Sequence, residues 1–402
     1  MKYLKFFSLI LFFLSVSCDQ KTDNNRKETK IKPEIKDYVD FLNNQHTSAK
    51  DYILTLFNKY DIVILSERAH YEYTQYNTIL NIISDKRFID SVGTVFVEVG
   101  VSSEQNKVNE FLKSENLREK EIKQKTLEIY RNIPFFPNWD KTSYYDFLIQ
   151  LYKINQKLTS SEKVDLYYSD VPFSWKETKT KKEYQEFIDT LETRDSVIAQ
   201  QIIFHFEKDK NSKKRKKALI ILNYRHAFIN IRYTKNGQKT ENVGRYLKEK
   251  YGNQVVSILI NDINNKNNKF FPYHHGKWDA SFELLNISNI GFDFKQSPFG
   301  KDSFDMYPVK NDLTYNDVFS GFIYTAPMDS FIFKKGVPNY ISDDFKKEYI
   351  RRNRISGYHP DIENDTINRT WMYSEKRWCS NYDAVRYEIN QWKTYNNTKK
   401  QK

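Results

Sequence analysis

Short runs of apolar and β-branched residues recur along the chain, with amphipathic segments between them. The apolar runs are typical of strands buried on both faces, and they span residues 61–65, 93–99, 164–170, 218–222 and 254–260. The segments between them repeat apolar residues every three or four positions, which predicts helices, and they span residues 74–85, 103–114, 144–158, 192–209 and 243–252. Strands alternating with helices predict an α/β fold with a mostly parallel central sheet flanked by helices.

The pattern departs from simple strand–helix alternation in two regions. Residues 141–158 and 174–210 carry more helical pattern than a single crossover needs, which predicts helical insertions. From about residue 265 the elements become shorter, more aromatic and richer in turn residues. No internal repeat is visible, and we expect one α/β domain over residues 36–393, followed by a polar tail over 394–402.

The first residues are typical of an export signal. Two lysines precede an apolar stretch over residues 6–14, and small residues lead into Cys18. This arrangement resembles a bacterial lipoprotein signal over residues 1–17, and the apolar stretch is too short to span a bilayer. We therefore expect a lipidated Cys18, a flexible polar tether over 18–35 and a membrane-anchored lipoprotein of the bacterial cell envelope, either periplasmic or surface-exposed. The alternative is an ordinary signal peptide with an incidental cysteine.

Composition narrows the range of partners and cofactors. The net charge of +12 favours nucleic acid or an anionic membrane surface only if the basic residues cluster. The lysines are scattered, and the densest run, residues 208–218, is typical of a solvated helix end or loop, so we expect no nucleic-acid partner. Neither common glycine-rich phosphate motif occurs. Cys379 would remain unpaired beside a lipidated Cys18, so no disulfide framework is expected.

Polar and ionisable residues follow the apolar runs. In a parallel sheet the carboxyl ends of neighbouring strands meet at one edge, where ligand and catalytic sites collect. We therefore expect the strand-end side chains to surround one crevice. These residues are Glu67, Arg68, His70, Glu98, Asp170, Asn223, Arg225 and His226.

Two histidines among several carboxylates suit two kinds of chemistry. A histidine can take a proton from water while a carboxylate orients it, and nearby arginines can stabilise an oxyanion. Histidine and glutamate also ligate transition metals. Each residue alone has a simpler interpretation, because a strand-end glutamate often caps a helix and His226, before Ala227 and Phe228, could be a buried core histidine. Repetition at successive strand ends favours a shared site.

The same positions resemble the motifs of the erythromycin esterase family. That family has Gly-Glu-x-x-His-Gly after a strand, and residues 66–71 occupy this place, keeping the glutamate and the histidine but neither glycine. A phenylalanine and a strand with a glutamate follow in the family, and they match Phe88 and Glu98. The resemblance covers about residues 50–260, with further matches in the family's order at 108–112, 153–155, 168–170, 194–195, 223–226 and 243–247.

The resemblance implies an ester or lactone hydrolase that acts on a small molecule without a metal or other cofactor. His70 would be the general base for a hydrolytic water. Glu67, Glu98 and His226 would position that water, the base and the substrate carbonyl. The expected substrate-binding residues are Arg68, Asp170, Asn223 and Arg225.

Two alternatives come from the wider superfamily, which includes haem-binding ChaN-like lipoproteins and Tiki/TraB-type proteins. The chain could bind haem or a divalent metal without catalysis, with His70 or His226 as ligand, or it could be a metal-dependent peptidase-like protein. Ser66 and Tyr71 stand where the family has glycines, so we expect a narrower pocket. This departure argues against macrolide lactones as the natural substrate.

Overall fold

The computed structural model describes residues 31–134, 141–231, 233–235, 238–266, 269–306, 312–357, 374–377 and 381–393. The expected signal peptide, Cys18, Cys379, the polar tail and most of the tether lie outside these residues. Helix α1 spans Pro33–Leu42, so regular structure begins within the stretch assigned to the tether. In the part of the chain that is described, no helix is both long enough and apolar enough to cross a bilayer.

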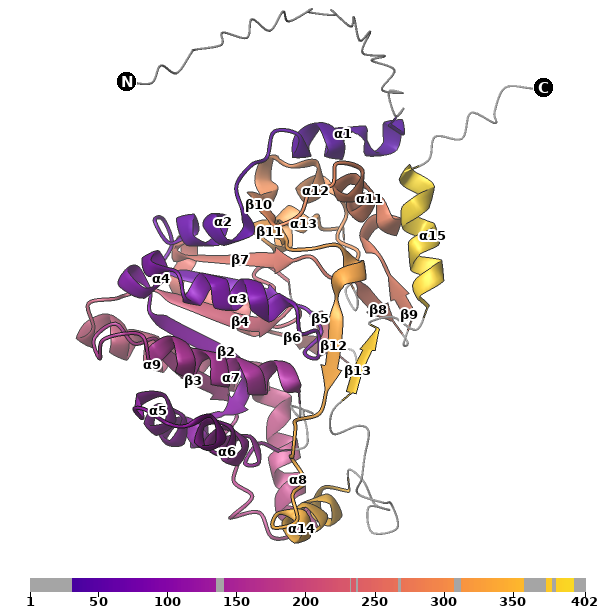
Figure 1. Ribbon diagram of the computed structural model, residues 1–402. Coiled ribbons are helices and arrows are strands. Elements are labelled where there is room, and N and C mark those ends of the chain that lie inside the picture. The colour runs from indigo at the N-terminus through magenta and orange to yellow at the C-terminus, as the bar shows by residue number, and fades with distance from the viewer. Residues whose placement is uncertain are drawn as a thin grey trace, which may run out of the picture.

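A seven-stranded sheet forms the centre of the molecule, in the order β10–β11–β7–β1–β4–β2–β3 (Figure 1). The strands are β1 Ile62–Glu67, β2 Thr94–Val101, β3 Asp165–Asp170, β4 Ala218–Asn223, β7 Val255–Ile260, β10 Ile290–Asp293 and β11 Gly321–Tyr324. Neighbouring strands are parallel except β10 and β11, which are antiparallel. The predicted α/β fold with a mostly parallel sheet is confirmed.

The central strands carry apolar side chains on both faces because helices cover both faces of the sheet. In β1, Val63 and Leu65 face one core, whereas Ile62 and Ile64 face the other. The first core is closed by α2 Ala49–Leu56, α3 Gln75–Ile83, α4 Lys86–Ser91, α5 Gln105–Lys113, α6 Glu119–Tyr130 and α7 Thr142–Asn155. The second core is closed by α1, α9 Arg194–Ser212, α10 Val243–Tyr251, α11 Lys277–Leu284, α12 Pro298–Lys301 and α13 Tyr315–Val318.

The predicted helical insertions correspond to α7, to α9 and to α8, Lys181–Thr190. Helix α8 packs against α14, Lys346–Ser356, at one end of the molecule (Figure 1). Helix α15, Tyr382–Lys393, packs against α11. Three small antiparallel pairs complete the regular structure: β5 Tyr233–Lys235 with β6 Gln238–Thr240, β8 Asn264–Lys266 with β9 Lys269–Phe271, and β12 Ile332–Lys335 with β13 Ser374–Arg377.

Strand β12 fixes the loop that follows β1. The amide of Tyr73 donates to the carbonyl of Ile332 over 2.7 Å, and the amide of Lys334 donates to the carbonyl of Tyr71 over 2.9 Å. The Tyr71 ring packs against Phe333 with 4.8 Å between ring centres. A segment far along the chain therefore holds the backbone just after His70.

Candidate active site

The carboxyl ends of β1, β4, β2 and β3 lie side by side in that order. Glu67 ends β1 opposite Asn223, which ends β4. Glu98 lies in β2, and Asp170 ends β3. The structure therefore brings these strand-end residues to one edge of the sheet.

An irregularity in β2 surrounds Glu98. The register against β3 shifts between Val97 and Val101, and Gly100 has a φ of +103°. A Cβ on Gly100 would lie 2.4 Å from the ring of Tyr168, so this position needs glycine both for its backbone angle and for space. Such bulges bend a strand and redirect its side chains. The sequence thus places the bulge where Glu98 leaves the ladder.

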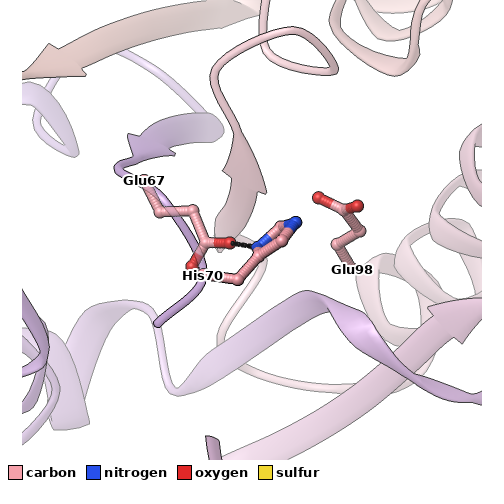
Figure 2. A group of neighbouring side chains, drawn as sticks. All are labelled: Glu67, His70 and Glu98. Atoms are coloured by element: carbon pink, nitrogen blue, oxygen red, sulfur yellow. Dashed lines mark hydrogen bonds and ion pairs between the residues drawn. The ribbon is translucent and has the colours of Figure 1, made fainter. Parts of the chain in front are cut away.

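His70 lies between two carboxylates (Figure 2). Its Nδ1 atom is 2.6 Å from Glu67 Oε1, and the other ring nitrogen points toward Glu98. An ionised carboxylate only accepts hydrogen bonds, so the contact with Glu67 requires the proton on Nδ1. A neutral His70 therefore has its free electron pair on Nε2, on the side of Glu98. The His70 side chain is 23% exposed.

Two tyrosines complete the environment of Glu67. The hydroxyl of Tyr144, from α7, donates to Glu67 Oε1 and lies 2.7 Å from His70 Nδ1. The hydroxyl of Tyr76, from α3, donates to Glu67 Oε2 over 2.8 Å. Burial and the nearby Glu67 charge raise the pKa of both tyrosines well above the ordinary value, so both stay protonated donors. Sequence reasoning missed them because they lie inside amphipathic helices.

Glu98 accepts hydrogen bonds from Arg194 in α9 and from the backbone of β4. Oε1 accepts from Arg194 Nη2 over 3.0 Å and lies 3.3 Å from His226 Nε2. Oε2 accepts from the backbone amide of Asn223 over 2.9 Å. Burial alone would raise the pKa of Glu98, but His226 and Arg194 outweigh it and hold that pKa well below its usual range. Glu98 is therefore a fixed negative charge.

His226 is paired with Asp195 at the start of α9. Its Nδ1 atom is 2.8 Å from Asp195 Oδ2, and its Nε2 atom faces Glu98. Burial alone would lower the pKa of His226, but the charges of Asp195 and Glu98 outweigh that effect and raise the pKa. The pair therefore favours a cationic His226. Asp195 was recognised only as part of an Arg-Asp match to the family, and nothing else in the sequence marks its role.

Asp170 holds Arg194 in place. Arg194 Nε donates to Asp170 Oδ1 over 2.8 Å, and Nη2 donates to Oδ2 over 3.1 Å. This two-point pair directs the guanidinium at Glu98 and brings Nη1 within 3.4 Å of His226 Nε2. Asp170 therefore acts through Arg194, and direct contact with a substrate does not fit this arrangement.

Arg68 corrects another expectation, because its side chain has no exposed surface. Nη1 donates to Glu72 Oε2 over 2.8 Å, and Nη2 donates to Asn261 Oδ1 over 2.8 Å. The guanidinium also lies 3.8 Å from the ring centre of Phe331. A buried ion pair with these partners holds the loop, so Arg68 is not placed to bind substrate.

The two remaining predicted residues differ in their surroundings. Asn223 is buried, and its side chain donates to the carbonyl of Arg68 over 3.3 Å, which ties the ends of β4 and β1 together. Arg225 is exposed, with its guanidinium 5.9 Å from the Tyr224 ring centre. A substrate contact of Arg225 stays a prediction.

One more carboxyl group reaches this edge of the sheet from β7. Asp262 follows that strand by two residues and is buried, and burial raises its pKa to about 7 although Arg68 acts in the opposite direction. Its position after an apolar run is the same signal that identified Glu98 and Asp170. Sequence reasoning stopped at the fourth strand end and missed it.

Glu67, His70 and Glu98 offer potential metal-ligand atoms that all lie within 4.8 Å of one another. Both oxygens of Glu67, however, already accept from His70 or a tyrosine. Both oxygens of Glu98 likewise accept from Arg194 or a backbone amide. A divalent cation bound here would also sit beside the positive charge of Arg194, which opposes its binding.

No family model and no curated protein matches the chain. Among solved structures, a succinoglycan biosynthesis protein matches with a TM-score of 0.48 and 10% identity, over 70% of this chain and 94% of that chain. An erythromycin esterase mutant in its open conformation matches with a TM-score of 0.45 and 10% identity, over 68% and 92% of the two chains. ChaN of Campylobacter jejuni, with cofacially bound haem, matches with a TM-score of 0.31 and 15% identity, over 52% and 85%. Likeness at this level decides neither family nor activity nor ligand.

Proposed function

We propose that the protein hydrolyses an ester or lactone with a water molecule activated by His70, without a metal ion. The observation that carries this proposal is the contact between Nδ1 and Glu67, which leaves Nε2 as the proton acceptor. A ring nitrogen of His70 and a carboxylate oxygen of Glu98 lie within 4.8 Å of each other. Two hydrogen bonds to one water span about 4.5 Å, so a water held by both groups fits between them.

In the proposed reaction, the water oxygen bonds to the carbonyl carbon of the substrate while one water proton moves to His70 Nε2. The carbonyl oxygen becomes an oxyanion, and the cationic His226 and Arg194 supply positive charge near it. The bond to the leaving oxygen then breaks, and that oxygen takes the proton back from His70. The products are a carboxylic acid and an alcohol, and the histidine returns to its neutral form.

A panel of chromogenic esters and macrolides, assayed with and without a chelator, tests this function. We compare purified wild-type protein with His70→Ala and Glu98→Ala, and use His46→Ala, an exposed histidine before α2, as the matched control. We expect turnover that survives the chelator, disappears in both site variants and persists in the control. Turnover that survives in His70→Ala, or that the chelator abolishes, would contradict the proposed mechanism.

The runner-up function is non-catalytic binding of haem or a divalent metal, and the proximity of Glu67, His70 and Glu98 favours it. If no ester is turned over by well-folded protein, a haem titration decides the matter. A Soret band that appears in wild type and is lost in His70→Ala would support the binder. A divalent ion that raises the Tm of wild type but not of Glu98→Ala would support the metal version.

The proposed enzyme is a lipoprotein of the cell envelope, anchored through Cys18. The pattern of residues 1–17 supports this location. Cells that express the full-length protein are grown with labelled palmitate, and the label should enter wild type but not Cys18→Ser. Equal labelling of both proteins, or of neither, would rule out this anchor.

A further inference from the structure

The first turn of α7 contacts the loop that carries His70 at three points. The hydroxyl of Ser143 donates to the carbonyl of His70 over 2.7 Å. The hydroxyl of Tyr144 reaches Glu67 and His70 Nδ1. Asp146 accepts from the hydroxyl of Tyr73 over 3.0 Å. Residues on one helical turn therefore hold the backbone, the imidazole and the end of this loop.

Tyr144 and Tyr76 change what Glu67 does to His70. A carboxylate with one imidazole partner would direct its whole charge at that ring and favour the imidazolium form. Here Oε1 is shared between His70 and Tyr144, and Oε2 accepts from Tyr76. Part of the negative charge is therefore satisfied by the tyrosines. The contact still fixes the proton on Nδ1, but it stabilises the cation less than an unshared carboxylate would.

We propose that the first turn of α7 is the positioning element of His70, with Tyr144 sharing the Glu67 carboxylate that holds Nδ1 and Ser143 holding the His70 backbone. This inference rests on the proposed function of His70 as a base. Neither residue touches the substrate in this arrangement, because both act through His70 or Glu67. Tyr144 is thus a positioning residue that acts on His70 through the Glu67 carboxylate.

The chain offers a close matched pair for a test. Tyr144→Phe removes one hydroxyl next to His70. Tyr145→Phe removes the hydroxyl of the next residue, which is also buried but donates to the carbonyl of Lys123 over 3.3 Å. Both variants keep the ring and the volume, so a difference between them reports the hydroxyl at Glu67. Tyr76→Phe serves as a second variant if Tyr144→Phe does not fold.

The readout is the ¹⁵N spectrum of His70, assigned with His70→Ala and followed over pH in the full protein. In Tyr144→Phe we expect the His70 titration midpoint to rise by about one pH unit, as expected for losing a hydrogen bond to a charged acceptor. The acid limb of the kcat/KM profile should move by the same amount, with Tyr145→Phe matching wild type. An unchanged His70 tautomer and midpoint in both Tyr144→Phe and Tyr76→Phe would overturn the proposal.

The spectrum also separates this inference from the proposed function. If no ester is turned over but the His70 midpoint still moves in Tyr144→Phe alone, the positioning role stands and the hydrolase proposal fails. If turnover depends on His70 but neither hydroxyl changes its titration, the hydrolase stands and the positioning role fails. Ser143→Ala, by contrast, should lower kcat several-fold without moving the titration midpoint, because it touches only the His70 carbonyl.

Discussion

The two histidines of the site are paired in the same way but surrounded differently. Each has a carboxylate on Nδ1, Glu67 at 2.6 Å from His70 and Asp195 at 2.8 Å from His226. Glu67 is 1% exposed and shares its charge with two tyrosines, whereas Asp195 is 15% exposed and accepts a weaker bond from the amide of Val243 over 3.3 Å. His226 also has Glu98 at 3.3 Å from its second nitrogen.

The difference shows how one type of pair can serve two roles. Two tyrosines donate to Glu67, so less of its negative charge acts on His70 than an unshared carboxylate would supply. On the other side, the charges of Asp195 and Glu98 raise the pKa of His226 and favour its cationic form. The helices on the two faces of the sheet make this distinction, because Tyr144 comes from α7 and Asp195 comes from α9.

Replacing each histidine's carboxylate partner with an amide tests the difference between the two pairs. We expect the larger loss of activity for Glu67→Gln, the partner of His70. Glu67→Gln replaces a carboxylate that only accepts with an amide whose nitrogen can donate to Nδ1, which favours the tautomer with the proton on Nε2. We expect kcat to fall about 10³-fold or more, in line with the loss seen when a triad carboxylate becomes an amide. Steady-state kinetics measure this loss, with circular dichroism as the folding control. A fall of less than tenfold would mean that Glu67 does not set the tautomer.

The buried pair behind His70 should govern stability rather than substrate binding. Arg68→Met leaves Glu72 buried without its cation, so we expect the free energy of unfolding to fall by about 3 kcal/mol. The double variant Arg68→Met/Glu72→Gln should recover part of this loss. Urea denaturation gives the energies. An unchanged Tm with a raised KM would instead return Arg68 to the substrate site.

For His226, we expect Asp195→Asn to change mainly how stability and kcat/KM depend on pH. The raised pKa of His226 means that its charge contributes stability that is fully present below about pH 6.5 and is lost as pH rises through the folded-state pKa. The variant lowers that pKa, so its stability deficit should be largest below about pH 6.5 and should shrink as pH rises through the folded-state pKa. We expect kcat/KM at pH 7 to fall about tenfold, with the basic limb of the profile shifted to lower pH. A profile identical to wild type would exclude Asp195 from this role.

The smallest effect is expected for Asp262, a buried carboxyl group close enough to Glu67 for their charges to interact. Its pKa of about 7 lies above that of an unfolded aspartate, so ionisation costs stability as pH rises from about 4 to 7. Asp262→Asn mimics the neutral form and should raise the free energy of unfolding by about 1 kcal/mol at pH 8, with no gain at pH 4. Thermal unfolding at both pH values checks this, and an equal effect at the two would contradict it.

The sheet and most of its polar edge could be predicted from the sequence, for a simple physical reason. Strands buried on both faces are mostly apolar, so the residues where polarity returns, such as Ser66 and Glu67 in β1, mark the carboxyl end. Parallel pairing then brings these ends together. The same argument predicts that Glu98 and His226 lie near each other, and His226 Nε2 is 3.3 Å from Glu98 Oε1.

What the sequence could not show is which way a polar side chain turns. Arg68 stands between two site residues, yet its guanidinium extends to Asn261 and Thr325 on the far side of the loop. Tyr144 lies in a helix among other tyrosines, and only packing distinguishes it from Tyr145. Directions of this kind depend on contacts between segments that lie far apart in the chain, which periodicity does not encode.

The contact between β12 and the loop after His70 joins segments that are synthesised at different times. A growing chain makes β1 and its loop early, but the carbonyl of Ile332 that accepts from the Tyr73 amide is made only after most of the chain has been synthesised. The backbone after His70 therefore stays without this partner while the chain is being made. The loop after His70 can gain this contact only once Ile332 has been made, although the loop itself is among the earliest parts of the chain.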